Sequence, residues 1–343
     1  MIPVVLLAAV SITSETPSVH YRQPQLAVRD RQVAATFGAG GAVYFAGSSD
    51  GGRSFSKPVK VGEAKVLALG HRRGPRIAFA GSAIVISAAV AEKGGGADGS
   101  LVAWRSTDGG KSWSAPATIN DVAASAREGM HAMAAGPKGM LYAAWLDLRR
   151  GRTDLYGARS TDGGVTWSKN VLIYQSPDGN ICECCHPSVA VDAKGGVYAM
   201  WRNWIGGARD MYLARSSDGG LSFGKAEKLG DGTWPLRACP MDGGAVAVDA
   251  SGQVVTVWRR AGEVFLARPG QPEKLLGPGK DPWLAAGSDG VYAVWTSAAG
   301  VQLLRPGKTE PQTLTGAFPT LAAGSPVVAA WEDHGAIKID VLR

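Results

Sequence analysis

Short apolar segments recur along the whole chain, and each is followed by a small turn and a second apolar segment. Runs of this length, rich in valine, alanine and aromatic residues and bounded by glycine-containing turns, predict β-strands. Seven copies of the first segment occur, at Gln25–Val28, Arg76–Phe79, His131–Ala134, Ser188–Val191, Ala245–Val248, Trp283–Ala286 and Thr320–Ala323. In the last five copies the second segment ends in a tryptophan, at Trp145, Trp201, Trp258, Trp295 and Trp331. The pattern predicts an all-β chain of repeated small sheets, with these tryptophans packed between them.

Four nearly identical octets, each reading Ser-x-Asp-Gly-Gly-x-Ser/Thr-aromatic, follow third strands of the same repeat. They occupy residues 48–55, 106–113, 160–167 and 216–223, and their aspartates are Asp50, Asp108, Asp162 and Asp218. These aspartates are 58, 54 and 56 residues apart (108−50, 162−108, 218−162). An aspartate that accepts backbone amide hydrogens, followed by paired glycines that allow positive φ, is typical of a tight turn. The octets are therefore predicted to be folding elements.

Repeats of roughly 40 to 55 residues with three or four strands each predict a β-propeller. We count seven blades, with six as the alternative. The last copy ends after three strands at Arg343, and the apolar run Val4–Ile12 could supply a fourth strand that closes the ring. The same run has the apolar character of a signal peptide but lacks the preceding Lys or Arg. We therefore expect residues 1–18 to be a signal peptide or a ring-closing strand, and 19–343 to form a single propeller domain.

The octets resemble the Asp-box repeat of sialidases and of the wider BNR-repeat propellers, and the resemblance covers nearly the whole chain. That superfamily includes exo-sialidases, other hydrolases and binding modules, so the resemblance implies a fold more firmly than an activity. It also implies that the octets lie on the face opposite the ligand-binding mouth. We call these two faces the Asp-box face and the mouth face.

Composition narrows the functional classes. The chain has 343 residues, 45% of them hydrophobic and 19% charged, which excludes both a disordered chain and a polytopic membrane protein. Its charge is +7, from 36 basic and 29 acidic residues, without a block of consecutive like charges that would predict nucleic-acid binding. The N-terminal apolar run is too short to span a bilayer. We expect an exported monomer, periplasmic or extracellular, with no nucleic-acid partner.

Alternating strand directions bring the segments that enter each first strand to the mouth face, together with the loops between second and third strands. All four cysteines and four of the five histidines belong to these segments. Polar groups that converge in a concave mouth are the default candidates for a binding site. The expected ligand is a carbohydrate or another acidic molecule. The candidate ligand-binding residues are Arg76, Arg127, Arg149, Arg202, Arg237, Arg259 and Trp204. Trp283, like Trp204, is not one of the five tryptophans that end the second segments, and it is a further candidate for ligand contact.

The segment Ile181-Cys-Glu-Cys-Cys-His-Pro187 places three thiols and an imidazole close together, and Cys239 precedes the next blade. Thiolates and imidazole suit copper(I) or zinc. In an oxidising compartment the same residues would form disulfides, and a Cys185–Cys239 bridge between adjacent blades is the preferred pair. A reactive thiol is the third possibility. The candidate metal or disulfide residues are Cys182, Cys184, Cys185, His186, Cys239 and His131.

Two further features bear on catalysis. Arg76-Ile77 resembles the start of the sialidase Arg-Ile-Pro motif, whose arginine binds the substrate carboxylate, although the proline is missing here. Asp98 loosely matches the acid/base aspartate of that family, and Glu128 is a candidate mouth carboxylate. A sialidase also needs a tyrosine nucleophile paired with a glutamate, yet Tyr292 lies in an apolar strand and is expected to pack within the sheet.

Three functions therefore remain open. The first is an exported propeller that binds an anionic ligand or glycan at a basic, Cys/His-lined mouth. The second is an exo-sialidase-like glycoside hydrolase, which is the activity expected if the chain is an enzyme. The third is a copper- or zinc-binding protein. A tyrosine hydroxyl within hydrogen-bond reach of a mouth carboxylate would favour the hydrolase, and free thiols would favour the metal site.

Overall fold

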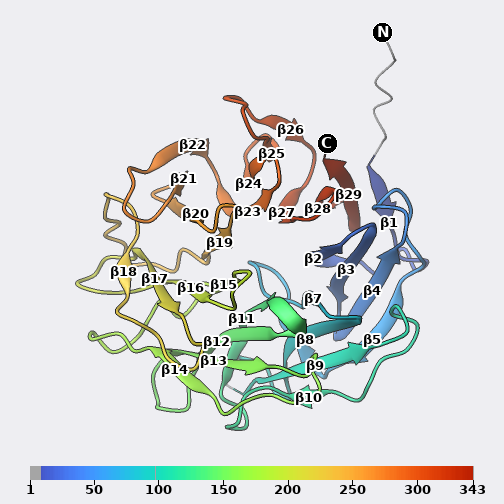
Figure 1. The fold of residues 1–343 in the computed structure, drawn as a ribbon, viewed down its shortest axis with the longest axis horizontal. Coiled ribbons are helices and arrows are strands. Elements are labelled where there is room, and N and C mark those ends of the chain that lie inside the picture. Colours follow the sequence, from blue (N-terminus) through green and yellow to red (C-terminus); the bar gives the residue numbers. More distant parts are fainter. Residues whose placement is uncertain (1–8, 97, 343) are drawn as a thin grey trace.

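Seven antiparallel sheets surround a common axis in the computed structural model, which describes residues 9–96 and 98–342 apart from the side chain of residue 128 (Figure 1). The protein is a seven-bladed β-propeller, as the repeat count predicted. Each of the seven predicted first segments lies in the innermost strand of a blade, apart from Ala323, which directly follows its strand. Within the described residues the helical content is one short 3-10 turn at Pro137–Gly139, and no helix is long and apolar enough to cross a membrane.

Blades 1 to 4 carry the four Asp-boxes. Blade 1 contains β2 (Arg22–Arg29), β3 (Gln32–Ala39), β4 (Ala42–Ser48) and β5 (Val59–Glu63). Blade 2 contains β6 (Val66–Leu67), β7 (Arg76–Ala80), β8 (Ala83–Ala91), β9 (Ser100–Ser106) and β10 (Ala117–Thr118). Blade 3 contains β11 (Ala126–Ala135), β12 (Leu141–Asp147), β13 (Asp154–Ser160) and β14 (Val171–Tyr174). Blade 4 contains β15 (Ser188–Val191), β16 (Val197–Arg202), β17 (Met211–Ser216) and β18 (Glu227–Lys228).

Blades 5 to 7 keep the same strand order without an Asp-box. Blade 5 contains β19 (Gly244–Val248), β20 (Val254–Arg260), β21 (Glu263–Ala267) and β22 (Lys274–Pro278). Blade 6 contains β23 (Lys280–Gly287), β24 (Gly290–Ser297), β25 (Gly300–Leu304) and β26 (Gln312–Leu314). Blade 7 contains β27 (Ala317–Ala322), β28 (Val327–Asp333), β29 (Ala336–Leu342) and β1 (Val10–Ile12).

The ring closes through the first described strand. β1 pairs antiparallel with β29, with Val10 opposite Ile339 and Ile12 opposite Ile337, and becomes the outermost strand of blade 7. The Ile12 side chain is buried between blades 7 and 1. The two ends of the described chain therefore share one sheet, which protects the outer edge of blade 7. Residues 1–8, which include part of the predicted apolar run, lie outside the described residues.

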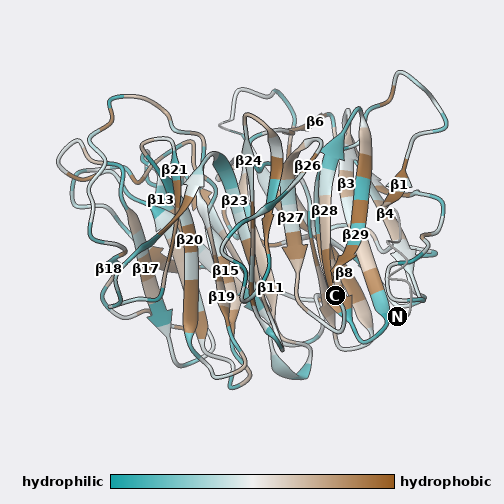
Figure 2. Cartoon of the chain, turned by 90° about the horizontal axis from the view of Figure 1, so that it is seen from above, coloured by the Kyte–Doolittle hydropathy of each residue, from teal (hydrophilic) through white to brown (hydrophobic). Residues whose placement is uncertain are grey.

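The hydrophobic core is divided among the interfaces between blades. Seven apolar clusters each combine residues of two neighbouring blades. The five repeated tryptophans belong to these clusters and are at most 4% exposed, which confirms that they are core residues and not a sugar-stacking column. In the view of Figure 2 the hydrophobic colour follows the strands, while hydrophilic segments gather towards the two ends of the propeller. We therefore look for candidate binding and catalytic residues in the loops and strand ends at the two ends of the propeller.

The Asp-boxes join the third and fourth strands of blades 1 to 4 and repeat one set of contacts. In blade 2 the Ser106 hydroxyl donates to Asp108 Oδ1 over 2.8 Å and accepts the Gly110 amide over 2.9 Å. Asp108 Oδ1 also accepts the Lys111 and Ser112 amides, each over 3.0 Å. The Ser112 hydroxyl and these further donors hold the pKa of Asp108 well below its usual range. Each box is a self-contained turn on the Asp-box face, as the sequence predicted.

Candidate functional site

The axial channel differs at its two ends. Towards the Asp-box face it is a cavity of about 740 Å³, lined by the last residues of the inner strands, most of them valine or alanine. Towards the mouth face, the charged or imidazole side chains that are at most 3% exposed include Arg72, Arg76, His131, His186, Arg202, Asp242 and Asp281. We call these seven residues the polar plug. Four of them were predicted as site residues, but their burial means that they do not line an open mouth.

Arg76 uses its guanidinium on the backbone. Its Nη1 donates to the carbonyls of Gly74 and Pro75, each over 3.1 Å, and its Nη2 donates to the Arg72 carbonyl. Burial, followed by the nearby Arg72 charge, lowers the pKa of Arg76 to about 9. The resemblance implied an arginine that binds a substrate carboxylate, but here the terminal nitrogens of Arg76 fix the segment that enters β7.

Arg72 and Arg202 connect different blades. Arg72 Nη2 donates to the Asp281 carbonyl, and its guanidinium lies 4.8 Å from the centre of the Trp283 ring. Arg202 at the end of β16 donates to the carbonyl of Asp242 over 2.9 Å. It also donates to the carbonyls of Arg209 over 2.6 Å and Arg259 over 2.7 Å. These arginines tie the loops of separate blades together, and Trp283 packs against one of them rather than facing an open mouth.

Two carboxylates meet inside the plug. The Asp281 amide donates to Asp242 Oδ2 over 2.9 Å, and both side chains are buried. Burial, followed by repulsion from Asp281, raises the pKa of Asp242 to about 7. Asp242 Oδ1, Asp281 Oδ2 and His186 Nε2 are buried without a hydrogen-bond partner among the described residues. The plug therefore holds polar atoms with unused bonding capacity, which is costly in a protein interior.

The two predicted histidines are neutral members of this plug. His131 Nε2 lies 3.1 Å from the Ser87 hydroxyl, and burial lowers the pKa of His131 to about 3. His186 Nδ1 accepts the Gly243 amide over 3.3 Å, and its ring stacks on Trp283 at a centroid distance of 6.2 Å. The group of potential metal ligands found among the described residues contains neither histidine.

Three cysteines form a buried cluster beside the plug. Cys182 Sγ lies 3.0 Å from Cys185 Sγ and 3.8 Å from Cys184 Sγ, and all three sulfurs are within 4.8 Å of one another. We call these residues the thiol cluster. Cys239 is exposed as a residue, but its thiol is partly buried. This partial burial, followed by the hydrogen bond with Cys184, raises the pKa of Cys239 to about 11. No disulfide joins the four cysteines in this structure, where the loop before β19 brings Cys239 to Cys184. The expected Cys185–Cys239 disulfide stays a prediction.

Arginines and tryptophans cover the thiol cluster on the mouth face of blades 4 and 5. The Arg209 guanidinium lies 4.5 Å from the centre of the Trp204 ring, and its Nη1 is 3.2 Å from Cys182 Sγ. The Arg259 guanidinium lies 5.5 Å from the centre of the Trp234 ring. Trp204 is 37% exposed. We define the arginine–tryptophan patch as Trp204, Trp234, Arg209, Arg237 and Arg259; none of its arginines takes part in an ion pair found among the described residues.

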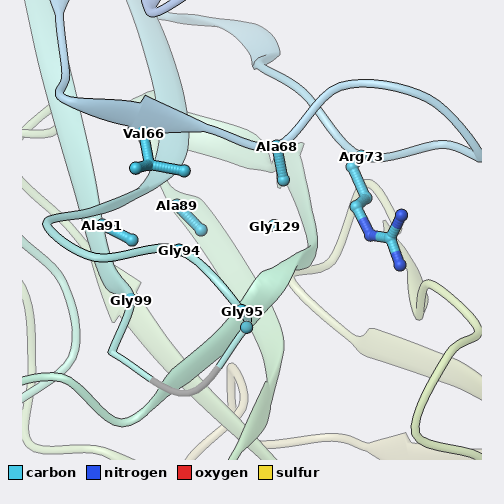
Figure 3. A pocket seen from close by; sticks show the side chains of 10 residues that line it. Val66, Ala68, Arg73, Ala89, Ala91, Gly94, Gly95, Gly99 and Gly129 are labelled. Atoms are coloured by element: carbon cyan, nitrogen blue, oxygen red, sulfur yellow. The ribbon is translucent and has the colours of Figure 1, made fainter.

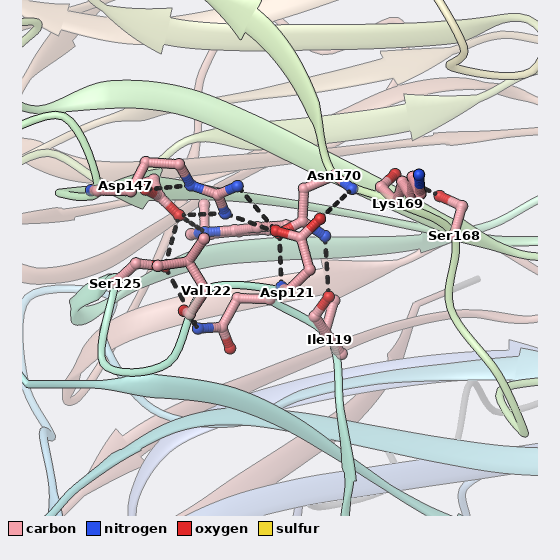
Figure 4. Close-up of polar contacts among 11 residues, drawn as sticks. Ile119, Asp121, Val122, Ser125, Asp147, Ser168, Lys169 and Asn170 are labelled. Carbon is pink, nitrogen blue, oxygen red and sulfur yellow. Dashed lines mark hydrogen bonds and ion pairs between the residues drawn. The ribbon is translucent and has the colours of Figure 1, made fainter.

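Two other predicted ligand-binding arginines are bound by acidic loops. Arg149 contacts Asp147 over 2.8 Å and Asp121 over 2.7 Å. It also donates to Asn170 over 2.7 Å, and Figure 4 shows Asp147, Asp121 and Asn170 in this network between blades 2 and 3. Arg127 donates to the Glu183 carbonyl over 3.1 Å and lies 4.0 Å from its carboxylate. The charges of these arginines are thus offset within the protein.

Of the two predicted catalytic carboxylates, the structure describes the side chain of Asp98, which has no hydrogen bond to the plug among the described residues. Asp98 Oδ2 accepts the amides of Glu92 over 3.2 Å and Lys93 over 2.7 Å, which holds the loop between β8 and β9. Glu128 falls within β11, and its side chain is outside the described residues. Near this loop a separate cavity of about 210 Å³ is lined mainly by small residues such as Ala89 and Gly95, with Arg73 at its side (Figure 3).

Tyrosine–carboxylate pairs lie on the other face. Tyr198 donates to Asp192 over 3.0 Å and Tyr292 donates to Asp289 over 2.6 Å. Both aspartates follow inner strands and belong to turns of the Asp-box face. Tyr292 is 1% exposed and packs within the sheet, which confirms its predicted structural role. In the described residues, neither of these pairs supplies a sialidase-type nucleophile at the mouth.

Sequence comparison decides the family. A model of the BNR repeat-like domain matches residues 42–258. This chain belongs to the BNR repeat-like family. No curated protein is detectably similar in sequence.

Solved structures similar to this BNR propeller span nearly its whole length at low identity. A Dyadobacter fermentans protein of unknown function is 18% identical, with a TM-score of 0.57 and 98% of each chain covered. An α-L-arabinanase of Penicillium chrysogenum in complex with arabinobiose is 13% identical, with a TM-score of 0.59 and 98% of each chain covered. An ulvan lyase, a polysaccharide lyase, is 12% identical, with a TM-score of 0.62 and 97% and 96% of the two chains covered. These likenesses establish the shared fold.

Two members of the arginine–tryptophan patch were not singled out from the BNR propeller's sequence. Arg209 and Trp234 belong to loops whose sequences are not repeated in the other blades, so repetition could not reveal them. The Arg209 amide donates to the Trp234 carbonyl over 2.8 Å, which joins the two loops. The sequence did contain one signal that could have pointed to them: residues 203–209 and 231–243 do not follow the repeated pattern of the blades. Trp204, Arg237 and Arg259 were predicted, and the structure brings them to the same blades.

Proposed function

We propose that this BNR propeller binds an acidic carbohydrate through the arginine–tryptophan patch. The observation that carries the proposal is the set of cations without carboxylate partners beside an exposed aromatic ring. Arg237 is exposed, and Trp204 presents 37% of its surface. Arginine binds carboxylate or sulfate groups through paired hydrogen bonds, and an indole packs against the apolar face of a sugar ring.

Binding is favoured over hydrolysis by the state of the plug. Among the described side chains, Asp242 and Asp281 are carboxylates of the axial end, and they are 1% and 2% exposed. Arg76 is bonded to backbone carbonyls, and the tyrosine–carboxylate pairs described above belong to the opposite face. A substrate would have to displace the plug before it reached these carboxylates. Trp204 and Arg237 of the patch, by contrast, are exposed at the surface.

Structural neighbours support a carbohydrate as the ligand class. One is the arabinanase in complex with arabinobiose, and another is an ulvan lyase bound to -[GlcA(1-4)Rha3S]-, with a TM-score of 0.61 and 12% identity. We place the binding function outside the cytoplasm, in the periplasm or the extracellular space. The apolar residues that precede β1 would be the export signal, because β1 itself belongs to blade 7. Cell fractionation with an antibody against the protein tests this location.

Calorimetric titration of the full chain tests the ligand class. The probes are oligosaccharides of uronic acids, sulfated oligosaccharides and neutral oligosaccharides of the same length. We expect acidic probes to bind, neutral probes to bind at least about tenfold more weakly, and added salt to reduce binding. Equal affinity for neutral and acidic probes would contradict the proposal. Release of shortened products during the titration would instead indicate an enzyme.

Two substitutions locate the binding surface. Trp204→Ala and Arg237→Gln should each weaken binding of the acidic probe by about tenfold, because they remove the stacking ring and a free cation. The matched control is Arg53→Gln, which changes an exposed arginine on the Asp-box face. If Arg53→Gln reduced affinity as much as Arg237→Gln, the ligand would be held by general charge and not by the patch.

A further inference from the structure

The thiol cluster has the composition of a soft-metal site. Cys182, Cys184 and Cys185 are each at most 7% exposed, and their sulfurs are mutually within 4.8 Å. A packed set of buried thiols has no donor strong enough to satisfy all its sulfurs, because sulfur is a weak hydrogen-bond partner. Three adjacent sulfurs on one short segment can instead act as ligands of one ion. Thiolates select copper(I) and zinc among the common biological metals.

Two arginines provide the compensating charge. Arg209 Nη1 contacts Cys182 Sγ directly over 3.2 Å, and the Cys182 amide donates to the Arg202 carbonyl over 3.0 Å. Arg202 and Arg209 are the cations that act electrostatically on Cys182. Copper(I) bound by three thiolates carries a net charge of −2, which two guanidinium groups offset. A buried trithiolate site without such cations would be strongly unfavourable.

The number of buried sulfurs distinguishes copper from zinc. Structural zinc sites are almost always four-coordinate, whereas copper(I) accepts three thiolates. His131 and His186 lie outside the group of potential ligands, and Cys239 is exposed beside Cys184. With metal–sulfur bonds of about 2.3 Å, a trigonal site needs sulfurs about 4 Å apart. The 3.8 Å between Cys182 and Cys184 already fits, and the 3.0 Å between Cys182 and Cys185 would open by about 1 Å.

We propose that Cys182, Cys184 and Cys185 bind one copper(I) ion through three thiolate sulfurs, with Cys239 outside the coordination shell. Binding converts three thiols to thiolates and releases three protons, and the oxidation state of copper does not change. This inference goes beyond the proposed carbohydrate binding and does not depend on it. The two sites meet at Arg209, whose guanidinium contacts both Trp204 and Cys182.

Anaerobic titration of the reduced full chain with copper(I), in competition with bicinchoninate, tests the proposal. We expect one equivalent of copper to bind, with thiolate-to-copper charge-transfer absorption and three sulfur neighbours by X-ray absorption spectroscopy. Zinc(II) is titrated in parallel. Failure of the reduced protein to take up copper would overturn the site, whether its cysteines had been isolated as thiols or as disulfides. Tighter binding of zinc with four sulfur neighbours would overturn the assignment to copper.

Three variants separate the ligands from their surroundings. Cys182→Ser should abolish stoichiometric copper binding, while Cys239→Ser should keep it unchanged. Arg209→Gln should keep the stoichiometry and weaken affinity by about tenfold or more, because it removes the compensating charge. Circular dichroism checks that each variant folds. If Cys182→Ser does not fold, the copper affinities of Arg209→Gln and Cys239→Ser still test the three-sulfur site. Loss of copper in Cys239→Ser would contradict the three-sulfur site.

Discussion

The two faces of this propeller are organised in opposite ways. On the Asp-box face each turn is held by bonds that span two to four residues, and the same bonds recur in four blades. On the mouth face Arg202 reaches Asp242 and Arg259, which are 40 and 57 residues away, and Arg72 reaches Asp281 over 209 residues. Hydrogen bonds that recur in four blades indicate residues that stabilise the fold. Hydrogen bonds that occur once, as those of the mouth face do, indicate residues that belong to a single site.

The sharpest test of this difference is Arg202→Ala. The substitution removes three charge-assisted bonds to backbone carbonyls, of which those to Asp242 and Arg259 join blades 4 and 5. Each such bond contributes about 1.5–3 kcal/mol, so the free energy of unfolding should fall by about 5 kcal/mol in urea denaturation. Arg237→Ala, an exposed arginine of the same face, is the control and should change stability by less than about 0.5 kcal/mol. Similar losses in both variants would mean that the plug does not hold the mouth together.

The two faces should also differ in how their carboxylates make the free energy of unfolding depend on pH. The pKa of the Asp242 carboxyl is about 7 in the folded protein, against an ordinary value of 3.8 for an aspartate, so the folded protein binds its proton more tightly than the unfolded chain does. Its contribution to stability is therefore complete below pH 4 and is lost as the pH rises through 7. Relative to Asp242→Asn, the native protein should lose about 4 kcal/mol of unfolding free energy over that interval.

The effect of Asp242 is measured as the difference in unfolding free energy between the native protein and Asp242→Asn. This difference is needed because His131 and His186 also change stability with pH, since burial lowers the pKa of both. These histidines act in the opposite sense: their contribution is complete above pH 6.5 and is lost as the pH falls. Urea denaturation at a series of pH values gives the difference directly. Asp108→Asn is the control from the Asp-box face and should not alter the profile between pH 4 and 7, since the pKa of Asp108 is lowered. Parallel profiles for Asp242→Asn and the native protein would contradict the prediction.

The smallest expected effect is that of a single Asp-box. Ser106→Ala removes the hydroxyl that bonds both Asp108 and the Gly110 amide, and should lower the free energy of unfolding by about 1 kcal/mol. Because the boxes are far apart and alike, Ser48→Ala, Ser160→Ala and Ser216→Ala should have nearly the same effect, and the four should add. Urea denaturation checks this, and strongly unequal losses would show that the boxes are not equivalent.

Sequence patterns predicted the fold well because the fold is built from local, periodic features. The seven first segments and the tryptophan column each reflect burial that recurs once per blade, and the octets reflect turn chemistry that is complete within eight residues. The first segments, the repeated tryptophans and the octets can each be recognised within one repeat, without knowing which blades are neighbours. The count of seven blades and the structural role of Tyr292 followed from the same regularity.

The candidate site was predicted only as a collection of residues. Strand order was enough to gather the cysteines, histidines and arginines on one face, but not to say which become buried. Arg76 is bonded to its own segment, Arg149 to acidic residues of blades 2 and 3, and Cys239 lies beside Cys184 instead of Cys185. These outcomes depend on the paths of unrepeated loops, which neither hydrophobic periodicity nor motif spacing encodes.

The pairing of β1 with β29 has a consequence for synthesis in the cell. Val10 emerges from the ribosome 329 residues (339 − 10) before its partner Ile339. Blades 1 to 6 can form as the chain grows, because each is built from neighbouring segments. β1 meanwhile waits as an unpaired strand, open to pairing with other nascent chains. Closure of the ring is therefore the capture of β1 by β29, and it cannot occur before residue 339 has been synthesised.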